Sequence, residues 1–241
     1  MSKKVSIIMP TYNYEKFIES ALTGILKQTY TNFELIIVDD GSTDNTWEIL
    51  KTIKDERVKI LTKEHSGIGK SLNLGFENAT GEYETWTAAD DLLYSTAIEE
   101  MVNVLETNPK IDFVYTRCEL GIMDETGLEE RYRIPYDQKI SMEWNPKTFY
   151  DEFNIGIIWL WRKNLRIKAG SDYIPTPCED YEMTTRMIEA GGKFYHLPKI
   201  LGWRRIHNLA SVKSLSEEYT KDLIQRMQKK RNFLQNKGER I

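Results

Sequence analysis

Apolar and polar positions alternate in a regular rhythm along the first half of the chain. Short apolar runs that end in Asp, Gly or Pro predict buried strands, and they occur at 5–9, 33–38, 58–61, 83–87 and 113–117. Between them, apolar residues recur at the three- and four-residue spacing of amphipathic helices. These segments predict helices at 15–27, 44–53, 66–78 and 95–107. Strands that alternate with helices predict an α/β fold with a mostly parallel central sheet flanked by helices.

The rhythm stops after Arg117. Residues 119–139 are mostly polar and predict a hairpin or a long excursion. Further strands are predicted at 155–161, 194–196 and 200–205, and further helices at 179–190 and 216–235. We expect one of Trp159 and Trp161 in the core and the other at the acceptor site, with core packing of both as the alternative. The pattern divides one compact domain into 1–117, 118–215 and a terminal helix at 216–241.

The composition is that of an ordinary globular protein. The chain has 241 residues, 40% of them hydrophobic, and a formal net charge of −4. This charge provides no basic field for nucleic acid, so no nucleic-acid partner is expected. Cys118 and Cys178 show neither metal-ligand spacing nor a disulfide framework, which favours a reducing, cytoplasmic location. The sequence has no signal-peptide pattern and no apolar run of about 20 residues, so we expect any membrane contact to be peripheral.

Two acidic pairs carry the strongest chemical signal. Asp39-Asp40 ends the second predicted strand, and Asp90-Asp91 follows the fourth. Open α/β sheets bind ligands in a crevice outside the carboxyl ends of their strands. Four carboxylates that face one crevice repel each other unless a cation lies between them. A divalent metal that carries a phosphate is the natural partner.

Five pieces of sequence occur in a fixed order. They are residues 10–13, residues 38–44, residues 67–91 with their glycines and acidic end, Glu179-Asp180, and Arg205-Ile206-His207. Together they resemble family 2 of the inverting, nucleotide-sugar-dependent glycosyltransferases, over nearly the whole chain. The resemblance implies the GT-A fold, which is a Rossmann-like α/β architecture with a smaller C-terminal acceptor subregion.

The resemblance also implies a nucleotide site. The residues assigned to it are Pro10, Thr11, Tyr12, Asn13, Asp39, Asp40, Gly67, Lys70 and Asp90. Tyr12 would stack on the base, and Thr11 would hydrogen-bond it. Asp39, in preference to Asp40, would accept a hydrogen bond from the N–H of uracil and so select UDP. Taken alone, the segment after Asp39 also predicts a turn and a helix cap, and the two roles are compatible.

Asp90 and Asp91 resemble the end of the family's Asp-x-Asp motif. One carboxylate would ligate Mn²⁺ or Mg²⁺ on the donor diphosphate, and the other would hold the ribose. Ala88 replaces the first Asp of the motif, which leaves open which carboxylate meets the metal. His207 is a further metal candidate. The candidates for the diphosphate are Arg204, Arg205 and His207.

Asp180 is the expected catalytic base, with Glu179 as the alternative. Inversion requires one carboxylate to deprotonate an acceptor hydroxyl as it attacks the anomeric carbon. Both acids begin a predicted helix, where acidic residues also occur because they complement the helix dipole. The position of the pair in the order of motifs favours the catalytic role.

The C-terminal stretch 216–241 predicts a basic amphipathic helix. Such a helix lies on an anionic membrane surface or packs on its own domain, and both alternatives stay open. We therefore expect a cytoplasmic enzyme, in peripheral contact with the inner face of the membrane if the helix binds lipid. It would transfer a sugar from a UDP-sugar to a glycan or lipid-linked acceptor in surface polysaccharide synthesis. The alternatives are a degenerate nucleotide- or glycan-binding module and a sugar nucleotidyltransferase.

Overall fold

The computed structural model describes residues 2–123, 129–132, 158–174, 176 and 179–206. The strands are β1 (Val5–Thr11), β2 (Phe33–Asp39), β3 (Val58–Thr62), β4 (Tyr83–Trp86), β5 (Leu92–Leu93), β6 (Phe113–Met123), β7 (Glu129–Tyr132), β8 (Trp159–Arg162) and β9 (Phe194–Ile206). The helices are α1 (Ile18–Leu26), α2 (Thr46–Leu50), α3 (Ile68–Glu77), α4 (Ala97–Thr107), α6 (Lys163–Lys168) and α7 (Glu179–Glu189). The predicted α/β fold is confirmed.

The sheet has a parallel half and a mixed half. Its strand order is β3-β2-β1-β4-β8-β6-β9-β5, with β7 paired to β6. β1 pairs in parallel with β2 and β4, and β2 in parallel with β3, which is the arrangement of a doubly wound nucleotide-binding half. Beyond β4 the strands mix: β8 is antiparallel to β4 and β6, whereas β6 and β9 are parallel. The parallel character predicted for the sheet therefore holds best in the first half.

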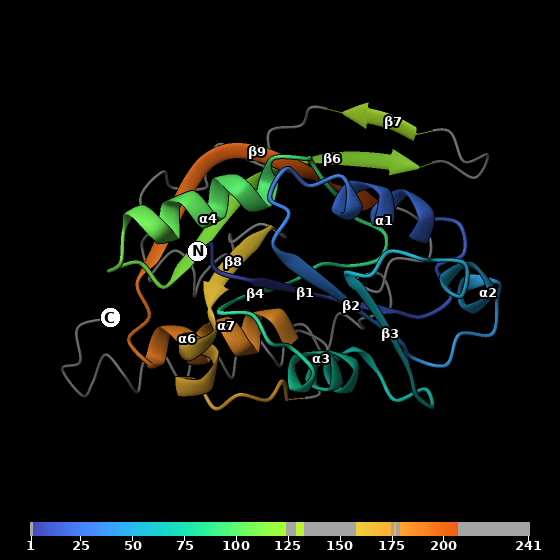
Figure 1. The fold of residues 1–241 in the computed structure, drawn as a ribbon, viewed down its shortest axis with the longest axis horizontal. Coiled ribbons are helices and arrows are strands. Elements are labelled where there is room, and N and C mark those ends of the chain that lie inside the picture. The colour runs from blue at the N-terminus through green and yellow to red at the C-terminus, as the bar shows by residue number, and fades with distance from the viewer. Residues whose placement is uncertain (1, 124–128, 133–157, 175, 177–178, 207–241) are drawn as a thin grey trace, which may run out of the picture.

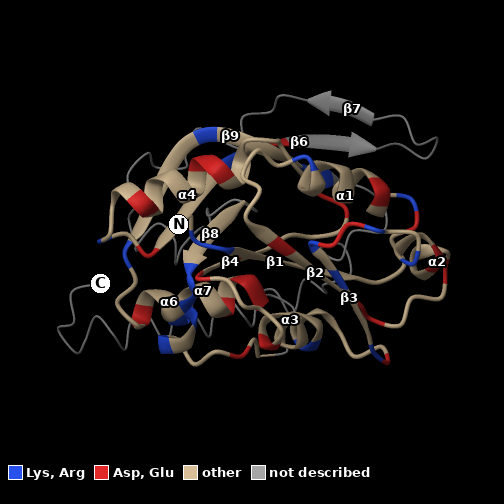
Figure 2. Cartoon of the chain, viewed as in Figure 1, with Lys and Arg blue, Asp and Glu red and all other residues tan. Residues whose placement is uncertain are grey.

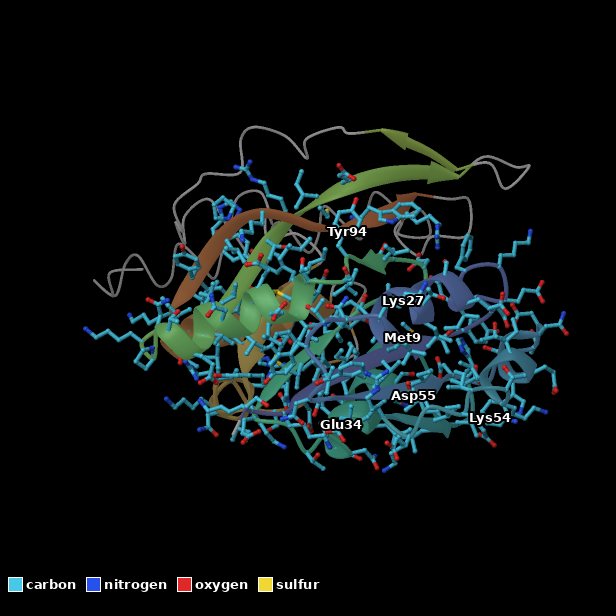
Figure 3. The ribbon with its side chains drawn as sticks, turned by 45° about the horizontal axis from the view of Figure 1, so that its top comes forward. Met9, Lys27, Glu34, Lys54, Asp55 and Tyr94 are labelled. Atoms are coloured by element: carbon cyan, nitrogen blue, oxygen red, sulfur yellow. The ribbon has the colours of Figure 1, made fainter. Side chains whose placement is uncertain are left out.

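Helices cover both faces of the sheet, as Figure 1 shows. Alternate residues of β1 point to opposite faces, as in any strand. Ile7 and Met9 pack with the apolar residues of α1 and α4, whereas Ile8 packs with those of α3, α6 and α7. Met9 is labelled within the body of the fold in Figure 3, and Lys54 is labelled at its periphery. Buried side chains fill the clusters on both faces of the sheet. We therefore expect ligands at the carboxyl ends of the strands.

Several local predictions need correction. Pro10 does not end β1, which continues to Thr11 in register with Asp39. The two short strands predicted near residue 200 form the single strand β9. Trp159 and Trp161 are both buried in one cluster, because side chains two residues apart on a strand share a face. The predicted hairpin after Arg117 is confirmed as far as it is described, since β6 and β7 pair antiparallel.

The predicted helix in 216–241, His207 and most of the segment between β7 and β8 lie outside the described residues. The division into 1–117, 118–215 and 216–241 therefore stays a prediction. Within the part of the chain that the structure describes, no helix combines the length and apolarity that a bilayer crossing requires. In the view of Figure 2, acidic and basic positions are interspersed over the ribbon rather than collected in one region.

Candidate functional site

The carboxyl ends of β1 and β2 are held together by their own loops. Asn13, which has a φ of 57°, donates its backbone N–H to Ser42 Oγ at 3.0 Å. Its side-chain Oδ1 accepts from the Thr43 N–H at 2.8 Å. One residue further on, Tyr14 N–H donates to Thr46 Oγ1 at 2.8 Å. The sequence-predicted Asn13 thus joins the two loops that border the crevice, whereas its contact with a nucleotide stays a prediction.

The two neighbouring aspartates after β2 have different surroundings. Asp40 accepts the backbone N–H groups of Ser66 and Gly67 at 2.9 and 2.8 Å and forms an ion pair with Lys63. Asp39 is buried, and its Oδ2 accepts the Ser42 N–H at 3.2 Å. Its Oδ1 has no hydrogen-bond partner among the described residues. Asp40 is therefore committed to the loop before α3, whereas Asp39 keeps an oxygen for a ligand.

Thr11 adds a second buried polar atom at the same place. Thr11 lies directly opposite Asp39 in the parallel register of β1 and β2. Its Oγ1 is also without a hydrogen-bond partner in the described parts of the chain. Buried polar groups are nearly always satisfied, so an unpaired hydroxyl beside an unpaired carboxylate oxygen is typical of a ligand site.

Aromatic and basic residues border this point. Tyr12 is 37% exposed and stacks on the ring of His65, with ring centroids 4.0 Å apart. Gly67 precedes α3 with a φ of 94°, a conformation that favours glycine. Lys70 is exposed on the first turn of that helix. The structure thus brings the predicted nucleotide residues of three loops to one edge of the sheet.

Asp90 and Asp91 form a buried acidic turn after β4. Tyr14 hydrogen-bonds the Asp90 side chain, and the Arg205 backbone N–H donates to Asp91 Oδ1 at 3.1 Å. Burial and the neighbouring charge of Asp90 raise the pKa of Asp91, although Arg204 and Arg205 act in the opposite direction. The turn therefore holds two carboxylates in an environment that favours a bound cation.

The two arginines of β9 differ because they lie on opposite faces of the strand. Arg205 is 3% exposed, and its guanidinium donates to the Asp90 carbonyl at 2.7 Å and to Ser20 Oγ at 3.1 Å. The guanidinium thus holds the acidic turn, whereas contact of Arg205 with a diphosphate stays a prediction. Arg204 is partly exposed, and its charge lowers the pKa of both Asp91 and Asp180.

Glu179 and Asp180 begin α7, whose acidic positions are red in Figure 2. Asp180 Oδ1 accepts the Tyr181 N–H at 2.7 Å. Burial raises the pKa of Asp180. For Glu179, burial and then, to a smaller extent, the charge of Asp180 raise the pKa to about 7, although its own backbone N–H opposes the shift. Carboxylates with raised pKa values are suited to accept a proton near neutral pH.

A clamp joins the segment before α7 to the nucleotide half. Asn73 of α3 holds the backbone of Tyr173 at two points: its Nδ2 donates to the carbonyl at 3.0 Å and its Oδ1 accepts the N–H at 2.7 Å. The Tyr173 phenol hydrogen-bonds the Trp86 side chain, and the charge of Asp180 contributes to its raised pKa after burial. Tyr173 thus lies between β4 and the candidate base.

The donor chemistry of the acidic turn fits a hard divalent cation. Mg²⁺ is usually bound through one or two carboxylates together with substrate phosphates and water, and Asp90 and Asp91 provide two carboxylates. The described residues contain no cluster of three or more His, Cys, Asp or Glu side chains that would hold a metal by themselves. The third candidate ligand, His207, lies outside them.

The sequence analysis missed three residues of this site: Tyr14, Asn73 and Tyr173. Asn73 lies in one of the five motif pieces, and this position could have marked it as a site residue. The sequence gives no sign that its side chain hydrogen-bonds the backbone of another segment. Tyr14 and Tyr173 are aromatic residues in loops, and their sequence spacing does not differ from that of core residues.

Comparisons with known proteins agree with this architecture. The sequence model of glycosyl transferase family 2 matches residues 6–164. An uncharacterized glycosyltransferase of Rickettsia typhi is 37% identical over 142 residues, which are 59% of this chain and 44% of that protein. Glycosyltransferase GlyG of Streptococcus pneumoniae is 41% identical over 104 residues, which are 42% of this chain and 35% of that protein. The chain spans less than half the length of these curated relatives.

Two solved structures share the fold. S. aureus TarS 1-349 in complex with UDP-GlcNAc has a TM-score of 0.75 at 21% identity, covering 93% of this chain and 66% of that chain. Mannosyltransferase PcManGT from Pyrobaculum calidifontis, in complex with GDP-Man and Mn²⁺, has a TM-score of 0.66 at 20% identity, covering 89% and 60%. These likenesses confirm the expected GT-A fold. On the family match and the relatives together, this chain belongs to glycosyl transferase family 2.

Proposed function

We propose that this protein transfers a sugar from UDP-sugar to a hydroxyl of an acceptor, with inversion at the anomeric carbon and with the help of a divalent metal. The observation that carries the proposal is a pair of buried polar atoms at the carboxyl ends of β1 and β2, Thr11 Oγ1 and Asp39 Oδ1, which have no hydrogen-bond partner among the described residues. The charge of Arg204, which acts on both Asp91 and Asp180, supports a crevice shared by the nucleotide side and the candidate base. Transfer requires that arrangement, because the donor and the acceptor meet there.

The nucleotide side supports uracil as the base. Uracil presents one ring N–H between two carbonyl oxygens. The unpaired Asp39 Oδ1 would accept that N–H, and the Thr11 hydroxyl would donate to a neighbouring carbonyl. Tyr12 offers an exposed aromatic face beside both atoms. The complexes of the two structural neighbours contain UDP-GlcNAc and GDP-Man, so the choice of base has to be measured.

The acidic turn would hold Mn²⁺ or Mg²⁺ through Asp90 or Asp91, and His207 is a third candidate. When bound, the metal would neutralise charge on the leaving diphosphate. Arg204 is partly exposed, and its charge acts on Asp91. It would also help to neutralise the negative charge of the leaving diphosphate. Arg205 and Tyr14 would keep the two carboxylates oriented.

Asp180, with Glu179 as the alternative, would act as the general base. It would take the proton from the acceptor hydroxyl while that oxygen forms a bond to the anomeric carbon. The bond from the anomeric carbon to the diphosphate oxygen would break, and its electron pair would leave with the nucleotide. Attack from the face opposite the leaving group inverts the anomeric centre.

The acceptor is proposed from the resemblance alone. A glycan or a lipid-linked saccharide for a surface polysaccharide fits the family. A cytoplasmic enzyme with peripheral contact at the membrane, made through 216–241, would suit such an acceptor.

Calorimetric titration tests the nucleotide site. UDP, GDP and ADP are titrated into the protein with Mn²⁺ and, separately, with EDTA. We expect the tightest binding for UDP, and only with Mn²⁺. A preference for GDP would contradict the role given to Asp39, and binding of no nucleotide would favour the degenerate module that Ala88 suggests.

Turnover tests the base. A panel of UDP-sugars is screened for release of UDP, and Asp180→Asn is compared with the unmodified protein. We expect a loss of about 10²–10⁴-fold in rate, with UDP affinity unchanged. An unchanged rate would remove Asp180 from this role, and the same comparison with Glu179→Gln would then decide the alternative.

A further inference from the structure

We propose that His65 is a positioning residue for the nucleotide base: it holds the ring of Tyr12 in the orientation that receives the base. This inference rests on the proposed nucleotide site and adds a residue that none of the motif pieces contains. His65 lies in the loop between β3 and α3, whereas Tyr12 lies after β1, so only the fold brings the two rings together.

The contact between the rings is close. Their centroids are 4.0 Å apart and their planes differ by 29°, which is a stacked arrangement. Tyr12 nevertheless remains 37% exposed. One face of the phenol ring is therefore covered by the imidazole, and the ring still presents accessible surface for a second stacking partner.

His65 is itself held by Asp40. Its Nδ1 lies 3.2 Å from the Asp40 carbonyl oxygen and 3.1 Å from Asp40 Oδ2. Both oxygens are acceptors, so Nδ1 carries the proton and donates. Asp40 is in turn fixed by Lys63 and by the backbone N–H groups before α3. The imidazole is thus anchored although its side chain is 55% exposed.

The Tyr12 ring, which His65 holds, follows directly on one of two buried polar atoms that have no hydrogen-bond partner among the described residues. Thr11 Oγ1 and Asp39 Oδ1 are buried at the ends of the paired strands, and Tyr12 is the next residue after Thr11. A planar heterocycle that satisfies both atoms with its edge would have its face near Tyr12. Both aspartates would then help to bind the base. Asp39 would bind its edge, and Asp40 would fix the stacked rings of Tyr12 and His65 that lie against its face.

The spacing of the rings excludes insertion of a base between them. Aromatic planes that flank a base must stand about twice one stacking distance apart, and the observed centroid separation is that of a single stack. The base would therefore use the other face of Tyr12, with His65 behind it. A fixed platform avoids the cost of ordering the tyrosine side chain on binding, which we expect to correspond to about 3- to 10-fold in affinity.

Three substitutions separate the parts of this role. His65→Ala removes the ring and the contact with Asp40. His65→Asn keeps a donor for Asp40 but removes the ring, and His65→Phe keeps a ring but removes the donor. Binding of UDP is measured by calorimetry with Mn²⁺, and binding of uridine by its displacement of UDP. Tyr195→Ala is the matched control, since Tyr195 is an exposed aromatic at the start of β9, in the mixed half of the sheet.

We expect His65→Ala and His65→Asn to weaken uridine and UDP binding by the same factor, about 3- to 10-fold, because the base is common to both. His65→Phe should weaken them less, and Tyr195→Ala should change neither. Thermal midpoints should stay unchanged, since His65 is exposed.

Three results would overturn the inference: binding by His65→Ala within twofold of the unmodified protein, unmodified binding by His65→Asn, or no advantage of His65→Phe over His65→Ala. Failure of the unmodified protein to bind any nucleotide would instead contradict the proposed function itself.

Discussion

Asp39 and Asp40 are adjacent aspartates at the end of β2, and they have different roles. Asp39 keeps a buried oxygen that no described residue pairs with, whereas Asp40 accepts two backbone N–H groups and pairs with Lys63. We expect Asp39→Ala to weaken UDP binding by about 10- to 100-fold, the worth of a hydrogen bond to a charged group, with little change in stability. Calorimetry and urea unfolding of the same samples provide the two measurements.

Asp40→Ala should act mainly on stability, with no more than the loss of UDP affinity, about 3- to 10-fold, expected when His65 loses its anchor. It leaves two partly buried N–H groups before α3 without this acceptor, so we expect the free energy of unfolding to fall by about 1–3 kcal/mol. Equal losses of stability in the two variants would contradict the division of roles.

The pKa of Glu179 has a consequence for stability against pH. Burial raises it from 4.5 to about 7 in the folded chain. Between these values the folded state keeps a proton that the unfolded state has released, so the stabilisation present below pH 4.5 is lost as pH rises through 7. We expect Glu179→Gln, which cannot ionise, to gain about 1–2 kcal/mol over the unmodified protein between pH 5 and pH 8, after allowance for partial exposure.

Urea unfolding at pH 5 and pH 8 measures this difference. Glu19→Gln, which changes an exposed glutamate in the first turn of α1, is the control and should show no such dependence on pH. A constant difference between Glu179→Gln and the unmodified protein at the two pH values would contradict the raised pKa.

Much of the candidate site could be predicted from single residues, because acids at strand ends and the ordered motifs are local features. Asp39 ends β2, Asp90 and Asp91 lie in the turn after β4, and Asp180 lies at the start of α7, as expected, whereas their roles stay predictions. The burial of Arg205 could not be predicted in this way. Its partners are the Asp90 carbonyl and Ser20, and sequence spacing does not bring these segments together.

At the scale of elements, the approach of α3 to β1 depends on one glycine. A Cβ built on Gly75 would lie 2.3 Å from Cγ2 of Ile8, which is far inside contact distance. We expect Gly75→Ala to lower the free energy of unfolding by about 1–3 kcal/mol through overpacking. Since Leu has no methyl on its β-carbon, Ile8→Leu should recover part of this loss in the double variant.

A double-mutant cycle by urea unfolding measures that coupling. Additive losses in Gly75→Ala and Ile8→Leu would mean that the two residues do not share the contact.

The elements themselves were predicted unevenly. The helices of the parallel half follow from periodicity, because each has one buried face, and β1 and β2 follow from continuous apolar runs, because they are buried on both faces. The two-residue strand β5 and the short helix α6 contain too few residues to show a period. β9 was predicted as two pieces because Pro198 and exposed neighbours interrupt its apolar pattern, although its pairing with β6 continues past them through register shifts.

For the molecule as a whole, one buried ion pair joins the two halves. Glu84 of β4 is fully buried, and both of its oxygens accept from Arg166 of α6, at 2.7 and 2.9 Å. Arg166 also donates to the Ser171 carbonyl at 2.8 Å, in the turn before Tyr173. We expect Arg166→Met to lower the free energy of unfolding by about 3–5 kcal/mol, because it leaves the buried Glu84 carboxylate with the weaker contacts to Trp161 Nε1 at 3.3 Å and Lys163 Nζ at 4.0 Å.

The double variant Glu84→Met with Arg166→Met should recover much of that loss, since neither charge remains. The exposed pair Lys51–Glu48 provides the control, and Lys51→Met should change stability by less than about 0.5 kcal/mol. Similar losses from the buried and the exposed pair would contradict the importance given to Glu84.

Side chains of β9 alternate between its two faces, and this alternation restricts which changes in the length of the strand are tolerated. Arg204 and Arg205 lie on opposite faces of the strand, one partly exposed and one buried. Insertion of one residue near Lys199 would exchange the faces of everything that follows, and would move the buried arginine to the partly exposed face. Insertion of two residues restores the alternation. In an insertion scan scored by UDP binding, we expect insertions of two residues to be tolerated better than insertions of one. Selection would then preserve whether the strand has an odd or an even number of residues.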